Sequence, residues 1–363
     1  MPLKQTKSSF ANQPVLTIPY PYWRGRIYAI LGLLVLLVIV IALATAIGSV
    51  DIPISTTSSI LLSKLPMIDI TPYWESAWET IVLEIRLPRV ILAGIIGAAL
   101  AIAGATYQGL FRNPLADPYL IGVAQGAALG AVIGFLLPAA GMGLGLGTVP
   151  LFAFAGALIS VAIVYGLARV GGALPMTTLI LAGVALGALF GAIVSYLVIT
   201  SGAKMQGIIF WLMGSFSLSQ WSEVQMILPI VMIGTVVIML FSRSLNIMQL
   251  DEEQAQQLGI NVERLKLILL TAATMITAAA VSFVGIIGFI GIIIPHTMRL
   301  IWGPDYRILL PLSVISGAIF LIGADALSRT VLAPTEVPIG VITAFCGAPF
   351  FLYLLRRRTK MLF

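Results

Sequence analysis

Few residues in this chain could perform chemistry, and those few do not form a reactive group. Its 363 residues include one histidine, His296, and one cysteine, Cys346. A lone cysteine excludes an intramolecular disulfide and a thiolate metal site, and His296 has no acidic neighbour in its apolar stretch. No Gly-Lys dipeptide occurs, so the chain cannot contain the phosphate-binding loop (P-loop) of an ATPase. We therefore expect neither catalysis nor a metal site, and we interpret His296 as structural.

Ionisable residues are also missing from the long apolar stretches, which bears on how a transporter could be driven. Ion-coupled carriers place costly carboxylates or other ionisable groups near the middle of the membrane. The apolar ranges 90–107, 118–168, 177–203, 224–242 and 267–295 contain no such group. Asp325 and Arg329 stand four residues apart near one end of a later stretch. That spacing allows both to pair on one helix face, which we interpret as structural. An ion-coupled secondary transporter without an ATPase is the alternative hypothesis.

The composition indicates a membrane protein. Hydrophobic residues make up 60% of the chain and charged residues 9%, with a mean hydropathy of +1.08, against roughly 25% charged residues in soluble domains. The uncharged run 27–48 would reach roughly 33 Å as a helix, enough for a bilayer core of about 30 Å. A backbone in lipid must satisfy its own hydrogen bonds, so the predicted fold class is all-α and polytopic.

The apolar stretches define one transmembrane domain, 27–358, between an N-terminal tail, 1–26, and a C-terminal tail, 359–363. The run 27–48 is too long for a signal peptide and is expected to be a retained first span. Further spans are expected at 90–107, 118–137, 149–168, 177–200, 224–242, 265–284 and 308–328. The last stretch, 337–355, is interrupted by Gly340, Gly347 and Pro349. Two short broken helices there would give about ten transmembrane helices.

Basic residues orient these spans. With the N-terminus inside, strict alternation leaves six of the 20 basic residues outside, together with the acidic segment 49–84. The positive-inside rule supports that orientation, with both termini cytoplasmic, and explains the net charge of +6 without nucleic acid. The six predicted outer residues are Lys64, Arg86, Arg89, Lys204, Arg299 and Arg307.

Glycines and one polar segment suggest how the spans work together. Glycine recurs at every fourth position over 122–134 and over 183–191, which lets helix backbones approach closely. Such stripes favour tight packing, or alternatively a smooth surface for sliding or for a pathway. In the cytoplasmic segment 245–266, Asp251 and Gln254 fit a capping box, and Gly259 can end that helix before Asn261 begins a second. Two short helices outside lipid indicate a docking element for a soluble partner; a simple linker is the alternative.

Several motifs resemble the FecCD permease family. They are RLPR from Arg86, GAALAIAGATYQGLFRNPLADPYLIGVAQGA from Gly97, LAGVALG from Leu181, WLMGSF from Trp211, GFIGIIIPH from Gly288 and PIGVITAFCGAPFFLYLL from Pro338. The resemblance covers about 27–358 in unbroken order. It implies the membrane subunit of a bacterial ABC importer for ferric siderophores, haem or cobalamin, located in the inner membrane. The implied partners are a second copy of the chain (occasionally a near-relative), two cytoplasmic ATPases that bind ATP and Mg, and an extracytoplasmic substrate-binding protein.

The resemblance also implies roles for single residues. Arg86, Arg89 and Arg307 match outer arginines that receive carboxylates of the binding protein, although ordinary interfacial anchoring is an alternative. Arginine suits that task because its planar fork binds a carboxylate through two hydrogen bonds. The turn at Asn113 matches an inner loop. The residues matched to the ATPase-coupling helices are Asp251, Glu252, Glu253, Ala255, Gln256, Leu258 and Gly259.

The predicted mechanism is a passive, gated conduit. A cavity at the dimer axis would lack fixed charge, so that a bulky chelate is released rather than trapped. We expect it to be bordered by Gly183, Gly187, Gly191, Gly340 and Gly347. The motifs do not separate cobalamin, haem and ferric siderophores, and iron chelates come first because that branch is broadest. The segment 49–84 and the N-terminal tail match no motif and receive no role.

Overall fold

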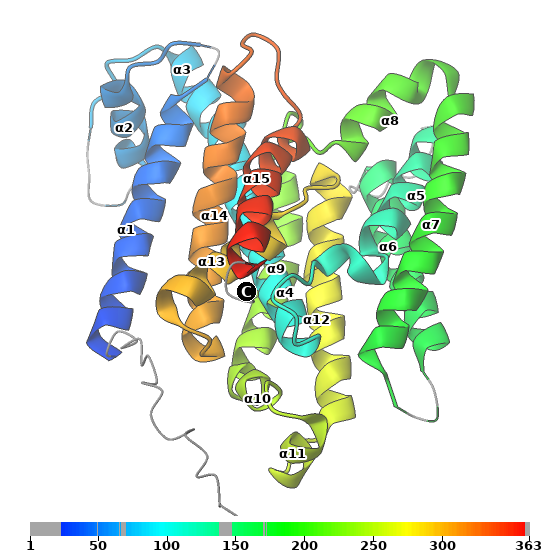
Figure 1. Cartoon of the computed structure of the whole chain (residues 1–363). Coiled ribbons are helices and arrows are strands. Elements are labelled where there is room, and N and C mark those ends of the chain that lie inside the picture. The colour runs from blue at the N-terminus through cyan, green and yellow to red at the C-terminus, as the bar shows by residue number, and fades with distance from the viewer. Residues whose placement is uncertain are drawn as a thin grey trace, which may run out of the picture.

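The protein is a bundle of helices, as the sequence predicts (Figure 1). A computed structural model describes residues 23–48, 50–64, 66, 70–137, 147–169, 171 and 173–359. Within these ranges the regular structure is helical, and the fold class all-α is confirmed. The predicted tails lie outside the described residues, apart from 23–26 and residue 359.

Seven helical segments among the described residues are long and apolar enough to cross a membrane. Of the four shorter apolar helices, the ten-residue one at 54–63 lies at one end of the bundle (Figure 1), and the other three join the seven. The expectation of about ten membrane helices therefore agrees with the structure. The long ones are α1 (Trp23–Ala46), α4 (Leu87–Leu110), α6 (Thr148–Ala168), α7 (Met176–Thr200), α9 (Trp221–Leu240), α12 (Val262–Val284) and α14 (Tyr306–Thr330). The shorter ones are α5 (Val123–Leu136), α13 (Ile290–Trp302) and α15 (Ile339–Thr359).

Helix α4 forms the centre of the bundle. In its apolar window 78% of the residues are buried, against 6% in α1, which lies at one edge (Figure 1). Small residues allow this central position, because a side chain at Gly97 or Gly104 would collide with the backbone of Gly317 or Gly291. The stripe 122–134 works in the same way: side chains at its middle glycines would strike the backbone of α6. The packing interpretation of that stripe is confirmed.

The two ends of the bundle carry different short helices. At one end, here called the α2 end, lie α2 (Ile54–Ser63) and α3 (Ser76–Thr80), which continues through a π-helix (Ile81–Arg86) into α4. The re-entrant helix α8 (Met205–Leu212) lies at this end as well (Figure 1). The opposite end, called the α11 end, carries α10 (Ser242–Ile247) and α11 (Glu252–Gln257) (Figure 1).

In the segment 49–84, which matched no motif, the described residues 50–64, 66 and 70–84 fold over the α2 end. Ile52, Ile60 and Val82 are buried together beneath Trp74 and Trp78. An ion pair of 2.6 Å between Lys64 Nζ and Glu79 Oε1 closes the outer side of this small core. These described residues therefore form a packed cap, in which α2 lies against α1 and against the π-helix that leads into α4.

The break between α12 and α13 overturns part of the predicted orientation. Gly285 and Phe289 both have positive φ, 77° and 71°, and the chain turns back at this break to form α13. The predicted spans 265–284 and 308–328 left residues 288–302 in a loop. One membrane crossing was therefore missed, and every later residue was assigned to the wrong side of the membrane up to the last stretch, 337–355. Arg299 and Arg307, predicted outside with 49–84, lie at the α11 end, and Arg329, predicted inside, lies at the α2 end.

Helix α15 is also simpler than predicted. The stretch 337–355 was expected to form two short broken helices, but α15 is a single helix with Pro349 in its interior. The short crossing is α13, which contains Pro295. Because α13 supplies the additional crossing, α14 runs from the α11 end to the α2 end and α15 runs back.

Candidate functional site

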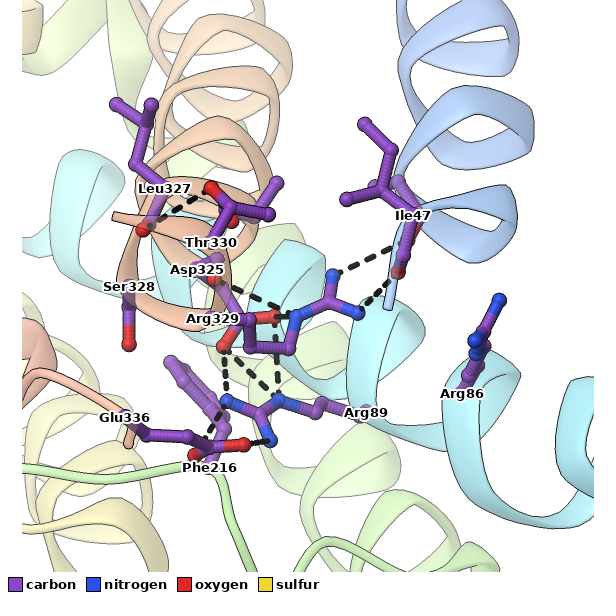
Figure 2. Close-up of polar contacts among 12 residues, drawn as sticks. Ile47, Arg86, Arg89, Phe216, Asp325, Leu327, Ser328, Arg329, Thr330 and Glu336 are labelled. Atoms are coloured by element: carbon purple, nitrogen blue, oxygen red, sulfur yellow. Dashed lines mark hydrogen bonds and ion pairs between the residues drawn. The ribbon is translucent and has the colours of Figure 1, made fainter. Parts of the chain in front are cut away.

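A buried cluster of ion pairs lies at the α2 end, between α4, α14 and the loop before α15 (Figure 2). We call Arg89, Asp325, Arg329 and Glu336 the rim cluster. The Arg89 guanidinium binds two carboxylates at once. Its Nε and Nη2 donate to Asp325 Oδ1 at 3.0 and 2.8 Å, and its Nη1 and Nη2 donate to Glu336 Oε1 and Oε2 at 2.8 and 3.0 Å.

Arg329 completes the rim cluster from within α14. Its Nε lies 3.1 Å from Asp325 Oδ2, so the predicted pairing of residues four apart is confirmed, although at the α2 end. Its two Nη groups donate to carbonyl oxygens at the end of α1, those of Ile47 at 2.8 Å and Ala44 at 3.1 Å. The cluster thus joins α1, α4, α14 and the loop that leads into α15.

Burial differs sharply between the two carboxylates. The Asp325 side chain is 1% exposed, whereas the Glu336 side chain is 38% exposed. Two arginines balance two acids, as buried charges require. Partial burial would raise the pKa of Glu336, but hydrogen bonds from Arg89 and Ser217 and the positive charge of both arginines outweigh it and hold that pKa below its usual value. Glu336 is therefore ionised at neutral pH.

Arg86 has a different environment. Figure 2 shows its side chain apart from the rim cluster. Its guanidinium donates to the carbonyl oxygens of Ala46, Thr45 and Val50, at 2.7, 3.3 and 2.5 Å. These bonds satisfy backbone acceptors at the C-terminal end of α1, where a cation also complements the helix dipole. Arg86 thus caps α1 in this state.

Arg307 does not join the other two predicted arginines. Its Nη2 lies 2.8 Å from Asp305 Oδ2 at the start of α14, and the same aspartate accepts from Asn246 of α10. The hydrogen bond from Arg307, together with that from Asn246, lowers the pKa of Asp305 to about 2. The prediction of one outer surface built from Arg86, Arg89 and Arg307 is therefore wrong for Arg307, because α13 reverses α14.

The sequence interpretation missed Glu336 and misplaced Arg329. Asp325 and Arg329 carried a signal, their spacing of four, but Glu336 stands in the polar run 334–337 like any surface acid. Its two partners, Arg89 and Ser217, are 247 and 119 residues away in the chain. No local pattern can indicate a contact over such a separation.

The loop after α8, the end of α12 and the start of α15 meet next to the rim cluster. At the start of α15, the amides of Ile339 and Gly340 donate to the carbonyls of Gly214 and Met213, at 3.1 and 3.0 Å. The Ser215 amide donates to the carbonyl of Val284, the last residue of α12, at 2.9 Å. Backbone that leaves helical geometry at membrane depth needs such partners. The loop after α8, the end of α12 and the start of α15 therefore hold one another.

The α11 end carries the segment predicted to couple to an ATPase. Gly259 has φ 84° and ends α11, and the Ile260 amide donates to the Ala255 carbonyl at 3.1 Å, as expected for this type of helix end. Asn261 Oδ1 accepts from the Arg264 amide at 3.1 Å and begins a helix, as predicted. That helix, however, is the long α12; the second short helix is α10.

The predicted capping box does not form, because Asp251 is engaged elsewhere. Asp251 makes no side-chain cap hydrogen bond to α11. Its Oδ1 accepts from Arg112 at 3.2 Å, and Arg112 also donates to the Leu250 carbonyl at 3.1 Å. Arg112 follows α4 with φ 49°, directly before the predicted inner turn at Asn113. The end of α4 is thus tied to the start of α11.

A second buried cation extends this connection. Lys266 Nζ, on a side chain 2% exposed, lies 2.8 Å from Glu252 of α11 and 3.1 Å from Glu263 of α12. Glu263 Oε2 also accepts from the amide of Leu174, in the loop between α6 and α7, at 3.0 Å. We call Arg112, Asp251, Glu252, Glu263 and Lys266 the α11 network. It connects α11 to α4, to α12 and to the α6–α7 loop.

The outer face of α11 is free to meet a partner. Ala255 is buried, and Leu258 is 61% exposed beside the exposed residues Glu253, Gln256 and Gly259. These exposed residues are accessible in the single subunit, and their contact with an ATPase stays a prediction.

The glycines predicted to line a pathway fall into two groups. Side chains at Gly183, Gly340 and Gly347 would collide with Leu120, Met213 and Phe289 of the same chain, so these three glycines serve packing. A side chain at Gly187 would reach only Gln125, at 3.7 Å, and one at Gly191 would meet nothing within 4 Å. The role of all five in a pathway stays a prediction.

Comparisons with known proteins agree with this architecture. The FecCD transport family matches residues 35–357. The chain is 49% identical over 280 residues to the cobalamin import system permease protein of Halobacterium salinarum, covering 77% of this chain and 74% of that one. It is 39% identical over 340 residues to the hemin transport system permease protein of Yersinia pestis, covering 91% of this chain and 96% of that one.

A solved structure is similar as well. It is described as an inward-facing conformation of a metal-chelate type ABC transporter. The TM-score is 0.77 at 30% sequence identity, and the match covers 90% of this chain and 98% of that one.

Proposed function

The chain belongs to the FecCD transport family of ABC importer permeases, and we propose that it moves a metal chelate across the membrane by alternating access. A substrate-binding protein delivers the chelate, and two ATPase subunits supply the energy. The observation that carries this proposal is the family match over 35–357, together with the anchored α11 segment. ATP and Mg belong to the ATPase subunits, and the chain itself provides the gated path.

The distribution of charge supports the direction of transport. With α13 as a crossing, Arg299 and Arg307 join the α11 end and Arg329 leaves it, so the number of the 20 basic residues assigned to that end rises by one. Under the positive-inside rule the α11 end faces the cytoplasm of the inner membrane, with both termini on that side. The α2 end then faces the binding protein.

Coupling to the ATPase is assigned to α11. Its exposed face, around Leu258, meets the ATPase, and its anchored face transmits the movement through Lys266 and Arg112. Packed helices move as near-rigid bodies, so a shift of α11 reaches α4, α12 and the α6–α7 loop together. Residues 251–259 are therefore the proposed ATPase contact.

Docking of the binding protein is assigned to the α2 end. We place its acidic side chains at Arg89, with Arg86 and Arg329 adjacent, and leave Arg307 out because it lies at the other end. Electrostatic pairs of this kind govern association rate and salt dependence more than equilibrium affinity.

The second copy of the chain is placed against α7 and α15. Both helices keep large apolar side chains exposed in the single subunit, such as Leu181 at 70% and Phe345 at 76%. Gly187 and Gly191 lie on α7 with open space beside them, which suits a pathway or a partner helix. Cys346 on α15 is exposed and is the only cysteine, so oxidative cross-linking of two unaltered copies tests this arrangement directly.

We propose a corrinoid as the first candidate for the cargo and an iron chelate as the second. The relative 49% identical is a cobalamin permease, whereas the relatives named for hemin and Fe(3+)-citrate are 39% and 37% identical. From the sequence alone, iron chelates came first because that branch of the family is broadest; the identities to the relatives now place the corrinoid first.

Transport in liposomes tests the proposal. The permease is reconstituted with its ATPase and binding protein, and accumulation of cobalamin, haemin and ferric citrate is measured with ATP inside or outside. We expect uptake of one chelate that requires both ATP and the binding protein, and none with an ATPase variant unable to hydrolyse ATP. No uptake of any chelate would contradict the proposal. Uptake that persists without ATP and follows a proton gradient would favour the secondary-carrier alternative.

A further inference from the structure

We propose that Glu336 occupies, in the free permease, the position on Arg89 that a carboxylate of the binding protein takes on docking. Docking is then an exchange of one carboxylate for another on the same guanidinium. This inference rests on the proposed function for the identity of the partner, but the exchange itself is a property of the permease alone.

The geometry of Arg89 provides the exchangeable position. Asp325 binds one edge of the guanidinium through Nε and Nη2, and Glu336 binds the other edge through Nη1 and Nη2 (Figure 2). A planar guanidinium can hold two carboxylates, each through a pair of parallel hydrogen bonds. Arg89 therefore keeps one bidentate partner when the other leaves.

Burial decides which partner can leave. Asp325 is 1% exposed and also pairs with Arg329, so its departure would leave buried Arg329 without a carboxylate and Arg89 with Glu336 alone. Glu336 is 38% exposed and pairs only with Arg89 among the described residues. Its side chain can turn into water, where an ionised carboxylate is well solvated. Glu336 is the exchangeable acid and Asp325 is the fixed one.

Charge then sets the chemistry of the partner. With Glu336 in place, two arginines face two carboxylates; once it leaves, the rim cluster carries one uncompensated positive charge. A single carboxylate from an aspartate or glutamate restores the balance, whereas a neutral side chain does not. Ser217, the other partner of Glu336, also lines a surface cavity of about 560 Å³.

The exchange connects docking to the moving parts. Glu336 Oε2 accepts from Ser217 Oγ at 2.7 Å, in the loop between α8 and α9, and Glu336 stands three residues before α15. Ser328 of α14 holds the neighbouring Val337 by two hydrogen bonds, of 2.6 and 3.0 Å, so the backbone stays in place while the Glu336 side chain leaves. Release of Glu336 thus frees a tie between α4, the α8–α9 loop and α15.

Arginine modification tests the exchange in the full-length permease in nanodiscs, without partner proteins. The wild type, Glu336→Ala and Glu336→Gln are treated with 4-hydroxyphenylglyoxal, and modified arginines are located by mass spectrometry. We expect Arg89 in Glu336→Ala to react about tenfold faster than in the wild type, because a tenfold change corresponds to the loss of about one charge-assisted hydrogen bond. Sodium acetate, compared with sodium chloride at equal ionic strength, should restore protection, because acetate fills the vacated position.

Two controls make the result specific. Glu336→Gln keeps the side-chain volume and removes the charge, so acetate should protect Arg89 less in that variant than in Glu336→Ala. Glu84→Ala removes an exposed acid at the same end that has no ion pair among the described residues, and it should leave Arg89 at the wild-type rate.

Three outcomes would overturn the proposal: an unchanged rate at Arg89 in Glu336→Ala, faster modification that acetate does not slow, or equal acceleration at Arg329. The last would mean that the rim cluster comes apart without Glu336, which is then a structural member and cannot leave. Failure of the liposome experiment leaves this test intact, because it needs neither ATPase nor cargo.

Discussion

The rim cluster and the α11 network solve the same problem with different cations. Each holds one nearly buried positive side chain between two carboxylates, Arg89 at 10% exposure and Lys266 at 2%. At Arg89 one acid is buried and the other is half-exposed, whereas both acids of Lys266, Glu252 and Glu263, are 36% and 39% exposed.

The difference teaches what each site can do. A guanidinium keeps an organised bidentate pair when one of two carboxylates leaves, whereas an ammonium group is a point charge without a fixed plane. The rim cluster can therefore exchange one carboxylate and keep the other in place. In the α11 network, loss of a carboxylate leaves Lys266 without an ordered arrangement. An exchangeable site suits docking at one end, and a fixed tie suits transmission of movement at the other.

The largest effect should come from the fixed acid of the rim cluster. Asp325→Ala leaves Arg89 and Arg329 without their shared buried carboxylate, and breaking a buried ion pair costs about 3–5 kcal/mol. We expect a much lower yield and a lower unfolding temperature of the purified protein in detergent. Glu84→Ala at the same end is the matched control and should unfold like the wild type. An Asp325→Ala protein as stable as the control would remove the distinction between fixed and exchangeable acids.

Lys266→Met should have a smaller effect on stability and a clear effect on coupling. Both acids released from Lys266 can be hydrated, so the expected cost is about 1–2 kcal/mol. Because α11 loses its tie to α12, less chelate should be moved per ATP hydrolysed, measured in liposomes. Arg264→Met is the matched control: Arg264 is an exposed residue of the same helix without an ion pair among the described residues. Equal coupling in both variants would argue against the α11 network as a transmission element.

Glu336→Gln should change stability little, by about 1 kcal/mol or less, because the lost ion pair is partly solvated. Removing an internal competitor of that strength should tighten binding of the binding protein by about fivefold. Surface plasmon resonance on nanodiscs at several salt concentrations measures this, with Glu84→Gln as control. Weaker binding in Glu336→Gln would mean that Glu336 contributes to the docking surface instead of competing with it.

Arg307→Ala should leave docking of the binding protein unchanged. Its side chain is 56% exposed and pairs with Asp305 at the α11 end, far from the rim cluster. The same resonance measurement should give the wild-type affinity and association rate, in contrast to Arg89→Gln, which should slow association and reduce its salt dependence. A loss of affinity in Arg307→Ala would contradict the reversed direction of α14.

Much of the fold could be predicted because a membrane helix is a continuous apolar run of about 20 residues, which is visible in the local sequence. The spans that form α1, α6, α7, α9, α12 and α14 were found in this way, and Gly259 and Asn261 marked true helix ends. α13 was missed because it has 13 residues and contains Pro295, so its apolar signal is short and interrupted. One missed crossing was enough to place Arg307 and Arg329 at the wrong ends.

The site was predictable only in part, for a related reason. Arg89 and the segment 251–259 were identified from motifs, and the pairing of Asp325 with Arg329 from their spacing. Glu336 and Arg112 carried no local signal, since each finds its partners on another element. Lys266 was missed although one of its two partners, Glu263, stands three residues before it in the same helix.

Composition and span length alone determined that this chain is a helical membrane protein, because a lipid-embedded backbone permits few other solutions. The near absence of charge inside the spans likewise follows from sequence. Which charges meet was decided only by the tertiary structure. The reversal at Gly285 sets the direction of α14, and that direction brings Asp325 and Arg329 to Arg89 while it takes Arg307 away. Ion pairs over hundreds of residues depend on topology, and topology depends on one short crossing.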